Sequence, residues 1–138
     1  MNDQDTLLRS ILTECRTIAV VGISADPSRP SHGVAKYMQD HGCRIVPVNP
    51  RYTEVLGEVC YAKLEDIPFA VQMVNVFRNT ADVPPIAASA VAIGAVCLWQ
   101  QLGVLSQPAD ALARAAGLRS VMDRCLRTEY ARLGLSAR

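Results

Sequence analysis

The chain has 138 residues, of which 50% are hydrophobic, 20% charged and 5% aromatic. A chain of this length suits one globular domain and buries enough surface to fold without disulfides or a structural metal. The formal net charge of +1 gives no drive for sequence-independent binding to nucleic acid or acidic membranes. Of the 14 basic residues, only Lys36 and Lys63 are lysines, and the rest are arginines.

The start of the chain, from about residue 3 to residue 16, is predicted to form an amphipathic helix. Leu8, Ile11 and Leu12 recur at helical spacing, and charged residues occupy the other side. Asp3 and Asp5 stand where a signal peptide would be basic, and no apolar run approaches the ~20 residues that span a bilayer. The five cysteines are far apart and include no CxxC pair. We therefore expect a soluble cytoplasmic protein without a metal site.

Five short apolar runs follow, each typical of a parallel strand that is covered on both faces. They occupy residues 18–22, 44–48, 71–77, 95–99 and, more weakly, 118–122. Helical segments that end in glycine separate several of them, whereas residues 49–68 form a long irregular connection. The alternation predicts a single α/β domain over residues 1–138, with a doubly wound, five-stranded, mainly parallel, Rossmann-like sheet at about 17–132 behind the extra N-terminal helix.

Ligands of such sheets bind beyond the carboxyl ends of the strands, where the strand order reverses. The loop after the first predicted strand offers a glycine, three serines and an arginine just before a helix, a combination that suits phosphate. Its candidate binding residues are Gly22, Ile23, Ser24, Ser28, Arg29 and Ser31. The loop lacks the GxGxxG pattern of dinucleotide sites. The alternative interpretation is a helix cap, in which the Ser31 hydroxyl accepts a hydrogen bond from the next turn.

The second predicted strand ends in Val48, Asn49, Pro50 and Arg51. An NAD-selective domain places a carboxylate here for the ribose 2′-OH, whereas an arginine suits a phosphorylated ribose, either the 2′-phosphate of NADP or the 3′-phosphate of coenzyme A (CoA). The alternative is a surface arginine in a turn. Other strand ends supply further arginines, so we expect a local anion site built from four of them, namely Arg29, Arg51, Arg78 and Arg124.

Five strings in order, VGIS with DPSRPS, then VPVNP, VFR, WQQLG and VMDRC, resemble the small stand-alone CoA-binding proteins of bacteria and archaea. These proteins are similar to the N-terminal CoA-binding domain of the succinyl-CoA synthetase α subunit, and the match spans about residues 18–130. The resemblance implies that residues 22–31 hold phosphate groups, residues 49–51 the adenosine end, and Phe77, Arg78 and Asn79 the neighbouring wall. It implies no synthetase activity, because the phosphorylated histidine and the nucleotide site belong to other parts of that enzyme.

Two side chains are candidates for the pantetheine end of CoA. Gln101 is placed to hydrogen-bond the pantetheine amides, and Trp99 either lines the same channel or packs in the core. Cys125 is the cysteine nearest the predicted crevice. It is either a small buried hydrophobe or a reactive thiol, and we hypothesise that it forms a mixed disulfide with CoA under oxidation.

No catalytic residues can be identified from the sequence. His32 and His41 are expected to be helix-end residues, and Asp123 is expected to pair with Arg124. No serine, histidine and acid form a triad. The leading function is therefore the binding of CoA or an acyl-CoA without evident catalytic machinery. Two alternatives remain, an NADP-linked or thioester-processing enzyme and a CoA-sensing interaction subunit of a larger complex, and a protein partner or homo-oligomer is left open.

Overall fold

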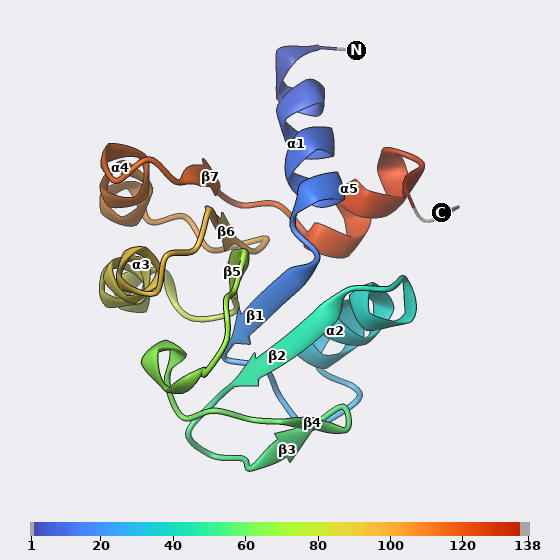
Figure 1. Ribbon diagram of the computed structural model, residues 1–138. Helices are drawn as coiled ribbons and strands as arrows, with labels where there is room; N and C mark the ends of the chain where they lie inside the picture. Colours follow the sequence, from blue (N-terminus) through green and yellow to red (C-terminus); the bar gives the residue numbers. More distant parts are fainter. Residues whose placement is uncertain (1, 136–138) are drawn as a thin grey trace.

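A computed structural model describes residues 2–135, which are built around a five-stranded parallel sheet (Figure 1). Its strands are β1 (Thr17–Val21), β2 (Arg44–Val48), β5 (Met73–Val76), β6 (Cys97–Gln100) and β7 (Arg119–Val121). Their order in the sheet is β2-β1-β5-β6-β7. Each of the five predicted runs overlaps one strand, so the predicted sheet is confirmed.

Within residues 2–135, five α-helices cover the two faces of the sheet. They are α1 (Asp3–Glu14), α2 (Pro30–Asp40), α3 (Val83–Ala92), α4 (Gln107–Ala115) and α5 (Leu126–Arg132). Successive strand residues point to opposite faces. Ile18 therefore packs into the hydrophobic cluster of α1, α2 and α5, while the next residue, Ala19, packs into that of α3 and α4. Figure 1 shows α3 and α4 on one side of the sheet and α2 and α5 on the other.

The extra N-terminal helix is tied to the end of the domain by charged side chains. Arg132 of α5 contacts Asp5 of α1 at 2.7 Å and Glu129 at 2.9 Å, and Arg124 contacts Glu129 at 3.1 Å. Arg9 of α1 adds a hydrogen bond of 3.0 Å to the Leu133 carbonyl. Within residues 2–135, no helix is long and apolar enough to cross a bilayer.

The connection after β2 is more ordered than predicted. It contains the antiparallel strands β3 (Glu54–Val55) and β4 (Glu58–Val59) and the 3-10 turn η1 (Leu64–Asp66). The two residues between the strands, Leu56 and Gly57, both have positive φ, at 57° and 74°. Such turns usually carry Asn-Gly or Asp-Gly, and a Leu-Gly turn gives no comparable sequence signal.

The strand order reverses between β1 and β5. From β1 the chain passes through α2 to β2, which pairs with β1 on one side. Later in the chain, β5 pairs with β1 on the other side. The loops after β1, β2 and β5 therefore meet at one point of the carboxyl edge. This is where open α/β sheets place their ligands.

Candidate functional site

Gly22 brings the loops after β1 and β5 into direct contact. It directly follows β1 with a φ of +89°, and an added Cβ would lie 2.4 Å from the Phe77 carbonyl oxygen and 2.9 Å from Arg78 Cδ. Any side chain would therefore collide with backbone while also adopting an unfavourable φ. The Gly22 N–H donates to the Val48 carbonyl at 2.9 Å, which joins the loop to β2 as well.

Hydrogen bonds within the predicted phosphate loop and to α2 shape it. Ser24 N–H donates to Ser31 Oγ at 2.9 Å, and Asp26 accepts from both the N–H and the hydroxyl of Ser28, at 2.9 and 2.8 Å. These two bonds lower the pKa of the Asp26 carboxyl, because they favour its charged form. Ser31, which lies in the first turn of α2, thus stabilises the loop through its side chain. The alternative interpretation of Ser31 as a helix cap is wrong. The cap position is Arg29, whose side chain makes no capping bond.

Asn49 locks the second loop against the first. Its amide Nδ2 donates to the Ile23 carbonyl at 2.9 Å, and its Oδ1 accepts from the Arg51 N–H at 2.9 Å. Its own N–H donates to the Tyr61 carbonyl at 2.9 Å. Asn49 therefore fixes the separation of the two loops, in addition to lining the space between them.

A cavity of ≈ 810 Å³ opens between these loops, and we call it the larger cavity to distinguish it from a second one beside α3. Thirteen of the predicted site residues line it: Gly22, Ile23, Ser24, Arg29, Ser31, Asn49, Pro50, Arg51, Phe77, Arg78, Asn79, Gln101 and Cys125. Ser28 does not, and Val48 lies in a neighbouring cavity. Residues that the sequence analysis missed also line it, and they are Pro30, Val34, Tyr52, Leu102 and Val104.

The larger cavity is positively charged. Arg29, Arg51 and Arg78 line it, and no described lining residue is acidic. Arg78 reaches Asp82 at 3.2 Å, whereas no ion pair of Arg29 or Arg51 is found among residues 2–135. Arginine binds phosphate through a planar fork of donors, so the site suits a ligand with more than one phosphate group.

Arg124 does not belong to this group of arginines. Its side chain turns to Glu129 of α5, and its carbonyl accepts a hydrogen bond of 2.8 Å from the Trp99 indole. Asp123 instead accepts from the Gly103 N–H at 2.7 Å. The predicted fourth arginine and the predicted Asp123–Arg124 pair are both wrong, because Arg124 pairs with Glu129 of α5 and Asp123 binds the Gly103 N–H. Trp99 is fully buried, which settles its position in favour of the core.

Gln101 and Cys125 lie at the β6–β7 end of the larger cavity. The Gln101 side-chain oxygen accepts from Asn75 Nδ2 at 3.2 Å and from the Leu126 N–H at 3.3 Å. Cys125 is half-buried, whereas the other four cysteines are buried. Burial raises the pKa of Cys15, Cys60 and Cys97, since it penalises the thiolate.

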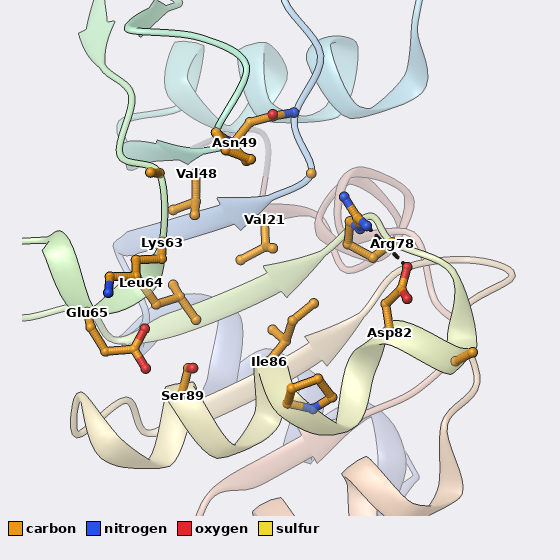
Figure 2. Close-up of a pocket in the computed structure, with 15 residues that line it drawn as sticks. Val21, Val48, Asn49, Lys63, Leu64, Glu65, Arg78, Asp82, Ile86 and Ser89 are labelled. Atoms are coloured by element: carbon orange, nitrogen blue, oxygen red, sulfur yellow. Dashed lines mark hydrogen bonds and ion pairs between the residues drawn. The ribbon is translucent and has the colours of Figure 1, made fainter.

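A second cavity of ≈ 370 Å³, here the smaller cavity, lies on the α3 side of the same edge (Figure 2). Its walls include Val21, Val48, Leu64 and Ile86, with charged residues around them. It shares a wall with the larger cavity, formed by Gly22, Asn49, Pro50 and Arg78. Figure 2 shows Glu65 beside Ser89, and the hydrogen bond from Ser89 lowers the pKa of that carboxyl.

The smaller cavity was not predicted from the sequence, although one signal for it is present. Ser89 is the only polar residue in α3, which is unusual for a helix on the outside of a small domain. The histidines, in contrast, lie as predicted, with His32 in the first turn of α2 and His41 at its C-terminal cap. In the described part of the chain, no group of three or more His, Cys, Asp or Glu side chains is placed to hold a metal ion.

The family model described as CoA binding domain matches residues 16–131. This chain belongs to the CoA-binding domain family. The small Bacillus subtilis protein YneT, which is uncharacterised, is 35% identical over 130 residues, covering 94% of this chain and 96% of YneT. A hypothetical protein of Pyrococcus horikoshii has a solved structure with 38% identity and a TM-score of 0.91, covering 94% of this chain and 91% of that one.

The family also links this chain to a larger enzyme. The ADP-forming acetate–CoA ligase of Methanocaldococcus jannaschii is 24% identical over 71 residues, which is 51% of this chain and 10% of the ligase. The expected membership of a CoA-binding family, including small stand-alone relatives, is thus confirmed. The particular likeness to the succinyl-CoA synthetase α subunit stays a prediction.

Proposed function

We propose that this protein binds CoA or an acyl-CoA across the two cavities of the carboxyl edge, with no evident catalytic machinery of its own. The observation that carries the proposal is the lining of the larger cavity, which has three arginines and no acidic residue among the described residues. CoA carries a diphosphate and a 3′-phosphate, so its charge complements such a lining. The volumes of both cavities, ≈ 810 and ≈ 370 Å³, lie within the usual range of small-molecule sites.

The charge difference between the cavities orients the ligand. The larger cavity takes the phosphates, with the diphosphate at residues 22–31 and the 3′-phosphate at Arg51. The smaller cavity has two cationic and two acidic side chains, Lys63, Arg78, Glu65 and Asp82, around apolar walls. It therefore suits an uncharged aromatic base, and we place the adenine ring there, between Val48 and Ile86.

The pantetheine arm then runs along the sheet edge from β1 toward β7. Phe77 and Asn79 follow β5, and Gln101 follows β6, so all three lie on this path. Gln101 is nearly fully buried and lies beside the arm, where its amide can bond to a pantetheine amide. A cytoplasmic location belongs to the same proposal, because five widely spaced cysteines without a CxxC pair are typical of a protein from a reducing compartment.

The proposal is tested by thermal unfolding with CoA, acetyl-CoA, dephospho-CoA, NAD and NADP. CoA at 100 times its Kd stabilises a native protein by about 2.7 kcal/mol, so we expect a rise in Tm of several degrees with CoA and acetyl-CoA. A rise with NADP and none with CoA would instead identify a dinucleotide enzyme.

Arg51→Ala tests the place of the 3′-phosphate. Loss of a charged, bidentate contact costs about 1.5–3 kcal/mol, so we expect CoA affinity to fall at least ~10-fold while that of dephospho-CoA changes little. Titration calorimetry measures both. Arg114→Ala is the matched control, because this arginine pairs with Asp110 near the end of α4, away from both cavities. Equal losses for the two ligands would remove the assignment.

A further inference from the structure

The larger cavity is charged at one end and neutral at the other. Arg51, Arg29 and Arg78 belong to the loops after β2, β1 and β5. The lining residues that follow β6 and β7 are Gln101, Leu102, Val104 and Cys125, and none is charged. A ligand held by its phosphates at the arginines therefore presents its uncharged end to Cys125. The inference below rests on the proposed binding of CoA.

The spacing of the strands fits the length of the ligand. Neighbouring strands lie about 4.8 Å apart, so the ends of β1 and β7 are separated by roughly 14 Å. A pantetheine arm has an extended length on the order of 15 Å, by the bond geometry of an extended peptide. An arm that leaves the diphosphate near β1 thus brings its sulfur to the neighbourhood of Cys125.

Gln101 is an independent indication that a polar ligand reaches this end. It is only 5% exposed and lines the cavity. Both hydrogen bonds of its side chain use the oxygen, and within residues 2–135 no partner is found for its amide nitrogen. This nitrogen is not itself a fully buried atom, so it is accessible from the cavity, and a ligand carbonyl there can accept its hydrogen bond.

Cys125 is the cysteine suited to react at this position. It alone among the five lines the cavity, and it is half-buried while the other four are buried. Leu102, which lines the same end, is 67% exposed, so this end of the cavity is open to solvent. A thiol in such a position can react with a bound ligand, and the leaving group of that reaction can escape into solvent.

We propose that Cys125 captures CoA covalently by thiol–disulfide exchange with a CoA disulfide bound in the larger cavity. The Cys125 thiolate attacks the near sulfur, a Cys125–CoA disulfide forms, and the disulfide bond of the reagent breaks. The second CoA leaves as a thiolate and takes up a proton equivalent to the one that Cys125 lost. No net oxidation occurs, and a reducing thiol reverses the step.

The test is the rate of adduct formation with CoA disulfide, followed by intact mass under non-reducing conditions and mapped by peptide mass. We expect one CoA per chain at Cys125, released by a reducing thiol. Glutathione disulfide, which lacks the nucleotide, should react at least ~10-fold more slowly at equal concentration, because it is not held beside the thiol. Arg51→Ala should slow the reaction with CoA disulfide and leave that with glutathione disulfide unchanged.

Cys125→Ser should form no adduct, while Cys60→Ser, the matched control at a buried cysteine, should react like the unmodified protein. Thermal unfolding with reduced CoA checks that both variants fold and bind. Binding of CoA without an adduct at Cys125 overturns the inference and leaves the proposed function standing. Equal rates with the two disulfides also overturn it, because Cys125 would then be an ordinary exposed thiol. Absence of any CoA binding removes the proposed function and the inference together.

Discussion

At the scale of single residues, Gly22 has the strictest requirement in the site. Its φ of +89° and the close Phe77 carbonyl leave no room for a Cβ. We expect Gly22→Ala to lower the free energy of unfolding by about 2–3 kcal/mol, since both strain and collision contribute. It should also weaken CoA binding, because the neighbouring Arg78 must move. Urea unfolding and calorimetry measure the two effects.

Gly33→Ala is the matched control. Gly33 lies in α2, and a Cβ there would meet no atom within 4 Å. Alanine stabilises a helix interior by about 0.5–1 kcal/mol relative to glycine, so this change should raise stability. If the two variants lose stability equally, close packing at Gly22 is not the cause.

One physical reason explains why the partners of two side chains were predicted wrongly from the sequence. The positions of Ser31 and Arg124 along the chain were correct, but their partners were not. Ser31 binds the Ser24 N–H across a loop, and Arg124 turns to Glu129 on a helix that the sequence analysis had not outlined. Strand ends can be predicted from local apolar patterns, whereas side-chain partners depend on how separate loops approach each other.

At the scale of elements, α1 packs with α5 in one hydrophobic cluster, and Arg132 adds an ion pair between them. A hydrogen bond from Arg132 lowers the pKa of the Asp5 carboxyl, which ordinarily lies near 3.8. A carboxyl with a lowered folded-state pKa stabilises the protein above its unfolded pKa, and this contribution disappears as the pH falls through the folded value. The contact between the two helices should therefore weaken in acid.

Arg132→Gln tests this pH dependence. We expect the variant to unfold at lower urea than the unmodified protein at pH 6, and the difference to shrink as the pH falls below about 4. Lys36→Gln breaks an exposed ion pair of 3.1 Å within α2 and should change stability little at either pH. A difference that stays constant down to pH 2 would show that the charge of Asp5 is not involved.

At the scale of the whole molecule, the parallel sheet was predictable and half of the site was not. Buried parallel strands are continuous apolar runs, and glycines end several of the helices, so both leave local signals. The smaller cavity is built by residues 62–65, by the turn after β5 and by α3. Residues 49–68 lack periodicity, so nothing local indicates that they fold over the edge of the sheet beside α3.

The division of the ligand between two cavities can be tested by filling one of them. Ala81 is exposed and lines the smaller cavity, so Ala81→Trp should displace the adenine ring and lower CoA affinity at least ~10-fold. Ala88→Trp is the control, because Ala88 is exposed on α3 and lines neither cavity. Calorimetry compares the two. Unchanged affinity in Ala81→Trp would place the base elsewhere.

The pairing of α1 with α5 also determines how the chain can be re-engineered. Asp5 and Arg132 are in contact, and Figure 1 shows α1 rising from the start of β1, away from the arrowheads at the carboxyl edge. Residues near both ends can therefore be joined by a short linker without obstructing either cavity. New ends opened at the exposed Gly94, between α3 and β6, would yield a circular permutant with both cavities intact.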